Sequence, residues 1–290
     1  MSPPDSARIS PTAHYTGFVW YRNGLSHEAF RTREGWLIHR VLRPMNLAYE
    51  LTGRAGLDAM LLSRHRVIDH LLSQAIESGE IGQVVEVAAG LSPRGRRFTE
   101  RHPDLIYVEG DLPGMVARKR EVLGRAGYGN PHHQVVEVDA LADDGPASLW
   151  GAFAEHLDPG RGTALITEGL LGYFDPASVA GMWQRFSRFL GDYPAGLYLS
   201  DLHTAADAGG VRGARLFQRL LSIFARGQVH LHFSGPEEAE AALRARGFAE
   251  ASVHDPASFA GRVDLPPVDR FVVQVIEARS GARSGTAARL

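Results

Sequence analysis

The chain has 290 residues, with 31 Lys and Arg against 33 Asp and Glu, and a formal net charge of −2. This near-neutral balance argues against nucleic acid or an anionic membrane surface as the main partner. With 44 % hydrophobic and 22 % charged residues, the composition is typical of a globular protein of one or two domains. Because the chain has no cysteine, disulfides, thiolate metal sites and a cysteine nucleophile are excluded.

The two ends of the chain carry no membrane or export signal. Residues 1–11 lack the apolar run of a secretory signal, and no stretch of about 18 apolar residues occurs anywhere. We therefore expect a cytoplasmic protein. Residues 280–290 are rich in Ser, Gly, Ala and Arg, a composition that predicts a disordered tail.

Hydrophobic periodicity predicts alternating helices and strands. Apolar residues recur at three- and four-residue steps over 57–78, which indicates an amphipathic helix ending at Gly79. We expect strands at 83–88, 105–109, 134–138, 163–167, 197–201, 251–254 and 271–276, and further helices at 112–123, 176–190, 214–225 and 236–246. The last helix follows Ser234, a potential cap.

This alternation predicts an α/β fold with a doubly wound, mostly parallel sheet of seven strands. Residues 57–279 would form this domain, and residues 1–56 would form a helical N-terminal extension or lid.

Ligands of open α/β sheets bind at the carboxyl ends of the strands, so polar residues there are candidates for binding. The first strand ends in the small-residue turn around Ala88 and Gly90, which lets a ligand approach the backbone. Glu109 and Asp111 follow Gly90 by 19 and 21 positions, close to the separation of about 20 at which an acid binds a ribose. Asp111 also precedes Leu112 and Pro113, where it could cap a helix. The spacing indicates a nucleoside-bearing cofactor but fits a dinucleotide and S-adenosylmethionine equally.

Three more charged residues occupy informative positions. Asp139 follows the third strand, where either an adenine edge or an ordinary loop would lie. Glu168 follows an apolar strand directly, so we expect it to meet a cation, a ligand or backbone donors. Arg64 lies on the apolar stripe of its helix, which predicts an anionic partner. That partner would be a ligand carboxylate or an internal acid such as Glu86 or Asp69.

Four stretches resemble the leucine carboxyl methyltransferase family of class I S-adenosylmethionine-dependent methyltransferases: residues 64–69, 84–91, 107–113 and 167–173, in the family's order. Residues 9–17 and 20–26 resemble the branch that includes the tetracenomycin polyketide carboxyl O-methyltransferase. The resemblance implies S-adenosylmethionine as cofactor and S-adenosylhomocysteine as product. Two residues depart from the family pattern: Ala88 replaces the usual first glycine of the turn, and Ser92 replaces a frequent Asp.

The same resemblance assigns roles to individual residues. Arg64 would bind the methionine carboxylate, Glu109 or Asp111 the ribose, and Asp139 the adenine amino group. The other expected cofactor-binding residues are Glu86, Ala88, Gly90, Ala140 and Glu168. Tyr173 and Glu168 would serve catalysis, and Tyr173 would face the acceptor. Apart from the resemblance, we expect the acceptor to be lined also by His14, Tyr15, Trp20, Tyr21 and His203, with packing in the core as the alternative for at least half of the aromatic residues.

The acceptor chemistry depends on whether a proton must be removed. A carboxylate is already ionised near neutral pH, whereas a phenol or alcohol needs a base. His14, His203, His230 and His232 are the candidate bases, the last two on one face of a possible strand. We expect no metal site, because cysteine and the H-E-x-x-H spacing are both absent.

We therefore predict an S-adenosylmethionine-dependent O-methyltransferase that forms a methyl ester on a small or polyketide-like acid. Four alternatives stay open at this point: a protein C-terminal carboxyl methyltransferase, a phenol or alcohol O-methyltransferase, a nicotinamide-dependent oxidoreductase, and a cofactor-binding sensor or scaffold without turnover.

Overall fold

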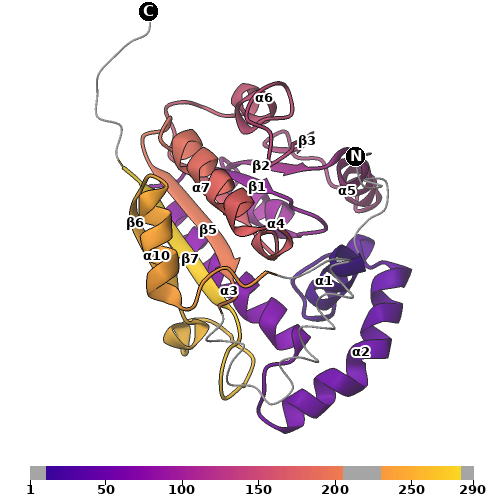
Figure 1. Cartoon of the computed structure of the whole chain (residues 1–290). Coiled ribbons are helices and arrows are strands. Elements are labelled where there is room, and N and C mark those ends of the chain that lie inside the picture. Colours follow the sequence, from indigo (N-terminus) through magenta and orange to yellow (C-terminus); the bar gives the residue numbers. More distant parts are fainter. Residues whose placement is uncertain (1–10, 205–229, 282–290) are drawn as a thin grey trace, which may run out of the picture.

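The structure, a computed structural model, describes residues 11–204 and 230–281 (Figure 1). Its α-helices are α1 (Pro11–Arg22), α2 (Arg33–Leu51), α3 (Leu57–Glu77), α4 (Arg94–Arg101), α5 (Pro113–Arg125), α6 (Leu149–Phe153), α7 (Pro176–Leu190) and α10 (Pro236–Ala245). Its strands are β1 (Gln83–Val87), β2 (Ile106–Asp111), β3 (His133–Glu137), β4 (Thr163–Thr167), β5 (Gly196–Leu202), β6 (Phe248–His254) and β7 (Gln274–Ser280). Short 3-10 helices include η1 (Glu28–Phe30), η3 (Leu171–Tyr173) and η4 (Pro256–Phe259).

The strands form one seven-stranded sheet in the order β3-β2-β1-β4-β5-β7-β6. All neighbours are parallel except that β7 runs antiparallel to both β5 and β6. This confirms the doubly wound, mostly parallel sheet predicted from the sequence. Because the strand order reverses between β1 and β4, their carboxyl ends border the crevice where such sheets bind ligands.

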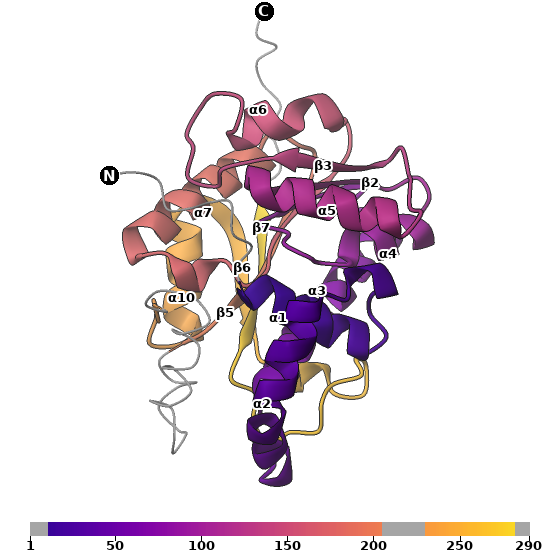
Figure 2. The same ribbon diagram turned by 90° about the vertical axis from the view of Figure 1, so that its right-hand side faces the viewer.

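Both faces of the sheet are covered by helices (Figure 2). Along β1, Val84 packs into the apolar core beneath α3 and α4, while Val85 and Val87 pack into the core beneath α6, α7 and α10. This alternation follows from the two-residue period of a strand. A strand buried on both faces reads as an apolar run, which makes β4 predictable from sequence, whereas β1 is predicted from its β-branched residues and also carries Gln83 and Glu86.

Several boundaries differ from the sequence predictions. Strand β2 continues to Asp111, so Glu109 lies inside the strand rather than at its end. Strand β7 ends at Ser280, so this residue is not part of a tail. Ser234 does not cap α10: the cap residue is Gly235, and the Glu238 carboxylate instead accepts hydrogen bonds from the Ser234 N–H and hydroxyl. The helix expected at 214–225 lies outside the described residues.

The described part of the N-terminal extension, residues 11–56, is mostly helical, as expected, and a buried polar cluster fixes it to α3. The carboxylate of Asp58 accepts hydrogen bonds from the hydroxyl of Tyr15 on α1 and, at 3.0 Å, from the amide of Asn46 on α2. His39 Nε2 lies 3.2 Å from the same carboxylate. Since α3 also carries Arg64, the extension is tied to the helix that enters the site. In the described part of the chain no helix is both long and apolar enough to cross a membrane.

We expect Asp58→Ala to lower the free energy of unfolding by about 3 kcal/mol, because it leaves the buried Tyr15, Asn46 and His39 without their shared acceptor. Urea unfolding measures the change. Glu34→Ala, at an exposed position of α2, is the control and should stay within about 0.5 kcal/mol of the unmodified protein. A cost for Asp58→Ala as small as that of the control would contradict this role.

Candidate functional site

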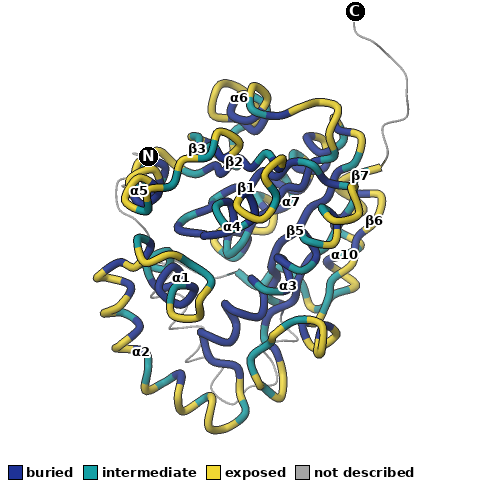
Figure 3. The backbone as a smooth tube through the Cα atoms, turned by 180° about the vertical axis from the view of Figure 1, so that it is seen from behind, coloured by how far each residue is buried: buried dark blue, intermediate teal, exposed yellow. Residues whose placement is uncertain are grey.

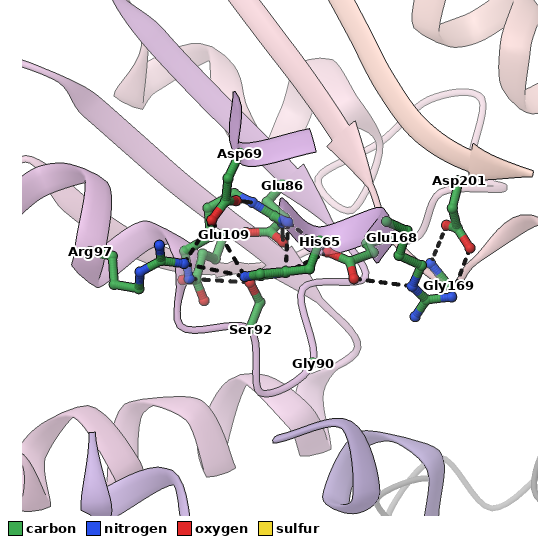
Figure 4. A network of polar contacts seen from close by, with 12 residues as sticks. His65, Asp69, Glu86, Gly90, Ser92, Arg97, Glu109, Glu168, Gly169 and Asp201 are labelled. Atoms are coloured by element: carbon green, nitrogen blue, oxygen red, sulfur yellow. Dashed lines mark hydrogen bonds and ion pairs between the residues drawn. The ribbon is translucent and has the colours of Figure 1, made fainter. Parts of the chain in front are cut away.

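A chain of buried ion pairs lies below the carboxyl ends of β1, β4 and β5 (Figure 4). Its hub is Arg94, the first residue of α4, whose side chain is fully buried. The guanidinium donates to Asp69 of α3 at 2.6 Å, to Glu86 of β1 at 2.5 Å and to Glu168 at 2.6 Å. Arg94 thereby joins a helix to the ends of two neighbouring strands.

Arg64 extends this chain of ion pairs toward the surface. Its Nε donates to Glu168 at 3.1 Å and its Nη1 to Asp201 at 2.7 Å. Asp201 also accepts a 2.6 Å hydrogen bond from the backbone N–H of Gly169. The predicted anionic partner of Arg64 therefore exists, but it is Glu168 and Asp201 rather than Glu86 or Asp69. The acidic candidates Glu86 and Asp69 pair with Arg94 instead.

The third guanidinium nitrogen of Arg64 has a different environment. Arg64 Nη2 lies beside Gly169, where an added Cβ would approach it to 2.9 Å. No hydrogen bond of Nη2 to another described residue is seen, and Arg64 lines the pocket described below. Gly169 also has a φ of 72°, the left-handed conformation that favours glycine. Residue 169 thus keeps this edge of the guanidinium uncovered.

The partners of the buried acids control their pKa values. Burial alone would raise the pKa of Glu168, but His65, Arg94 and Arg64 hold it far below its usual range. Burial would likewise raise the pKa of Asp69, yet His65, Arg94 and Arg97 lower it. Glu168 is thus an ionised residue bound to cations, and not the backbone-bonded core residue that the sequence allowed.

The turn after β1 is held by Asp111 at the end of β2. One carboxylate oxygen of Asp111 accepts a 2.7 Å hydrogen bond from the N–H of Gly90, and the other accepts at 2.8 Å from the N–H of Leu112. The cap residue of α5 is Leu112, so Asp111 does not cap that helix. Each oxygen keeps a lone pair, which leaves this half-buried carboxylate able to accept further hydrogen bonds.

The carboxylate of Glu109, unlike that of Asp111, is fully buried and paired with side chains. Glu109 is 1 % exposed, and its carboxylate lies 2.5 Å from Lys119 Nζ and 3.1 Å from His133 Nε2. Lys119 also donates at 2.5 Å to the carbonyl of Ser92, so this buried pair fastens the turn to β2 and α5. Of the two acids at the ribose spacing, only Asp111 remains accessible. Glu86 is equally buried, with Tyr107 donating to it at 2.7 Å.

Ala88 has a φ of 57° and is the only described residue other than glycine with a positive φ. This conformation places Cβ close to the backbone and is costly for any L-residue. In the family that the sequence resembles, a glycine usually occupies position 88. The geometry explains that preference: the turn needs a left-handed residue at position 88.

The adenine candidates lie on the next strand end. Asp139 is exposed, and its carboxylate accepts a 2.9 Å hydrogen bond from the N–H of Leu141. Ala140 is half-buried, and its carbonyl accepts from Arg185 at 3.2 Å. The N–H of Val138 donates to the carbonyl of Asp111 at 3.0 Å, so the two strand ends are adjacent. Gly90, Asp111 and Asp139 therefore lie on one edge of the sheet.

A pocket with about 680 Å³ of empty space, partly open to solvent, lies beside Arg64 and Asp201. Apolar side chains form one part of its wall, namely Met60, Leu61, Leu171 and Leu202. Tyr173 and His203, which the sequence analysis assigns to the acceptor, also line this pocket, together with Thr12, His230 and His232. His230 and His232 do not lie in a strand. Their rings instead stack at 5.9 Å, and the N–H of His230 donates to the Gly172 carbonyl at 3.0 Å.

His232 has a defined tautomer. Its Nε2 lies 3.1 Å from the Leu171 carbonyl and must donate to it, so Nδ1 carries a lone pair. This Nδ1 is buried and has no hydrogen-bond partner among the described residues. Burial lowers the pKa of His232, and neighbouring His230 adds to the effect. The imidazole is thus neutral near pH 7. Among the described residues, no group of three potential ligands could hold a metal ion.

The aromatic residues of α1 do not line this pocket. Tyr15 is buried and donates to Asp58, and the Trp20 ring packs 4.7 Å from His65. His14 pairs with the Thr32 hydroxyl at 3.0 Å, and Tyr21 lies beneath Arg31. The role of these four in acceptor binding has no support from the geometry, which uses them to pack α1. Thr12, at the start of α1, is what this helix contributes to the pocket.

Sequence reasoning missed Arg94, Asp201 and Gly169. Asp201 ends a predicted strand just as Glu168 does, so the rule applied to Glu168 would have found it. Arg94 gives no such signal, because a strongly basic helix such as α4 reads as a solvent-facing helix.

Comparisons with known proteins agree with this geometry. The sequence profile of the leucine carboxyl methyltransferase family matches residues 31–186. A protein of Mycobacteroides abscessus named as an S-adenosyl-L-methionine-dependent methyltransferase is 38 % identical over 134 residues, which is 44 % of this chain and 40 % of that protein. One of Rhodococcus jostii with the same description is 35 % identical over 136 residues, covering 47 % and 44 %. The matches therefore span less than half the length of these relatives.

Solved structures share the fold at low sequence identity. A methyltransferase structure from Thermobifida fusca has a TM-score of 0.65 at 15 % identity and covers 97 % of this chain and 99 % of its own. Human N-acetylserotonin methyltransferase, solved with S-adenosylmethionine, has a TM-score of 0.50 at 14 % identity and covers 93 % and 67 %. These likenesses show the fold alone. The cofactor is named by the sequence relatives, which are described as S-adenosyl-L-methionine-dependent.

We expect Ala88→Gly to raise the free energy of unfolding by about 0.5–1 kcal/mol, because glycine removes a left-handed penalty of roughly 1–2 kcal/mol but adds some unfolded-state entropy. Chemical denaturation measures this. Ala89→Gly is the matched control: Ala89 lies in the same turn but its own φ is not positive, and its side chain is buried, so the same change should destabilise. If both variants are destabilised alike, the turn is not strained at Ala88.

Proposed function

Because the chain belongs to the leucine carboxyl methyltransferase family, we propose that it transfers the methyl group of S-adenosylmethionine to an oxygen, most simply a carboxylate, of a small molecule. The observation that carries this proposal is the position of Arg64. Its guanidinium is anchored by Glu168 and Asp201, and one edge remains uncovered beside the pocket that Met60, Leu61, Leu171 and Leu202 line.

The residues present fit the cofactor. Asp111 would accept hydrogen bonds from the ribose hydroxyls, and the Gly90 turn would lie under the ligand. Arg64 Nη2 would bind the methionine carboxylate, with Asp139 and Ala140 near the adenine. Glu86, Glu109 and Ala88 would act indirectly, by holding strands and turn in place.

When bound, S-adenosylmethionine supplies a methyl group on a sulfonium, which an oxygen nucleophile displaces to leave S-adenosylhomocysteine. A carboxylate acceptor is ionised near neutral pH and needs no base. The protein's contribution is then to position the acceptor and exclude water. Met60, Leu61 and Leu202 would hold its apolar body, and Tyr173, 40 % exposed at the rim, would orient its oxygen.

One observation favours a second candidate, methylation of a phenol or alcohol. The unpartnered Nδ1 of His232 is a hydrogen-bond acceptor on a neutral imidazole in the pocket wall. Such a nitrogen would accept the proton that a hydroxyl must lose. It would not donate to a carboxylate, because its tautomer is fixed by the Leu171 carbonyl.

The two candidates predict different products and pH profiles. The protein is incubated with methyl-labelled S-adenosylmethionine and aromatic acids, phenols of equal size, or a peptide ending in leucine. We expect label in the acids as methyl esters, which release methanol in base, and a kcat/KM that is flat from roughly pH 6 to 9. Tyr173→Phe should lower kcat about tenfold and leave cofactor affinity unchanged.

The controls separate the alternatives. A base-stable label in the phenols would replace the carboxylate proposal with the hydroxyl one. In that case the rate of labelling should fall at acid pH and be lost in His232→Asn. Label in the peptide alone would indicate a protein acceptor. Tight binding of S-adenosylhomocysteine without any transfer would refute an enzymatic role and favour a cofactor sensor.

A further inference from the structure

Helix α2 carries an apolar face that nothing in the described structure covers. Five of its large apolar residues are exposed: Trp36 by 41 %, Leu37 by 55 %, Val41 by 70 %, Leu47 by 42 % and Leu51 by 79 %. Figure 3 shows the helix on the outside of the molecule, with most of its length exposed. These residues supply five of the eight large apolar side chains that are exposed among the described residues.

The inner side of α2 is already used. Gly35, His39, Leu42 and Asn46 are buried against the rest of the protein. A surface helix with one buried side normally presents charged and polar residues to water on the other. The packing of α2 on its own chain therefore does not explain its exposed apolar residues, which we call the outer stripe. A concentrated apolar patch of this kind indicates an interaction surface.

The spacing of the stripe identifies its occupant. Among the exposed positions of α2, Leu37, Val41, Pro44, Leu47 and Leu51 follow one another at steps of 4, 3, 3 and 4, a spacing that is the same in both directions from Pro44, whereas Trp36 lies outside this set. An isologous contact needs such self-complementarity, because a two-fold axis brings the same patch of two subunits together. We propose that α2 pairs with α2 of a second copy of this chain, antiparallel and with Pro44 at the two-fold axis.

This pairing places the apolar residues against one another. Leu37 of one copy lies opposite Leu51 of the second copy, and Val41 lies beside Leu47 and Ala48 of the second copy. Pro44 has a short side chain and, at the axis, lets the two helices approach closely. The N-terminal and C-terminal halves of the stripe thus cover each other in both copies.

The charges agree with an antiparallel arrangement. Arg40 is exposed, its guanidinium lies 5.6 Å from the centre of the Trp36 ring, and no ion pair to a described carboxylate is seen. Pairing about Pro44 brings Arg40 within one helical turn of Glu50 of the second copy. Glu50 is also half-exposed and pairs with Arg43 of its own chain at 3.2 Å. A parallel pairing would instead put Arg40 opposite Arg40.

The size of the α2 contact sets the expected affinity of the dimer. Helix α2 has 19 residues and is therefore about 28 Å long, so one pair of such helices gives an interface at the small end of specific contacts. We expect a reversible dimer whose population rises over the micromolar range. The proposal does not depend on the proposed function, because it uses no residue of the site.

Sedimentation equilibrium of the full chain from about 1 to 100 µM tests it. We expect the mass to rise from the 31.6 kDa of one chain toward twice that value. Leu37→Glu should raise the dissociation constant about 30-fold or more, since the new carboxylate would be buried twice in the contact. Leu141→Glu, at a 40 % exposed position after β3, is the matched control and should leave the dimer intact.

A charge exchange tests the orientation. Arg40→Glu and Glu50→Arg should each weaken the dimer, and the double variant should recover most of the lost affinity. Unchanged circular dichroism spectra exclude unfolding as the cause. A mass of one chain at every concentration would overturn the proposal, as would a dimer that Leu37→Glu leaves intact. Binding of the monomer to lipid vesicles through α2 would overturn it in favour of a membrane surface.

Discussion

The site depends on one constraint: a guanidinium buried among strand ends must be surrounded by carboxylates. Arg94 has no exposed surface and is compensated by Asp69, Glu86 and Glu168, which belong to α3, β1 and the end of β4. Removing one partner of such a cluster leaves an uncompensated charge in a medium that solvates it poorly, at a cost of about 3–5 kcal/mol. The relative positions of α3, α4 and the two strands are therefore tightly coupled. The cluster contributes less to overall stability than to fixing one relative position of α3, α4 and the two strands.

Arg64 takes its geometry from this arrangement. It shares Glu168 with Arg94 and adds Asp201 from β5, so two of its three nitrogens are committed and the third is left at the pocket. On the other side of the crevice, Asp111 and the Lys119 to Glu109 pair hold the turn around Gly90. The carboxylates at this edge thus divide into those that pair with buried cations, Glu86, Glu109 and Glu168, and Asp111, which accepts hydrogen bonds from backbone N–H groups and stays half-buried. A single pattern of acids at strand ends contains both kinds.

The fold was more predictable from the sequence than the site. Apolar runs such as β1 and β4 are buried on both faces and have a strong signal, whereas β2 was ended two residues early because Gly110 and Asp111 resemble a turn. Helical periodicity placed Arg64 inside, but it could not say which acid lies 104 or 137 residues away in the sequence, since that depends on strand order. From sequence alone, the aromatic residues of α1 fit an apolar wall over an acceptor and packing in the core equally well. The structure packs Tyr15 and Trp20 inward, because α1 has to bury one side against α2 and α3.

The central claim is that the uncovered edge of Arg64 recognises the amino-acid carboxylate of the cofactor. Calorimetric titration of the unmodified protein and of Arg64→Gln with S-adenosylhomocysteine and with methylthioadenosine, which lacks that carboxylate, tests it most directly. We expect Arg64→Gln to weaken binding of S-adenosylhomocysteine at least tenfold and to leave methylthioadenosine binding nearly unchanged. An equal loss for both ligands would mean that Arg64 only supports the fold of the site, and no loss for either would mean that the cofactor carboxylate lies elsewhere.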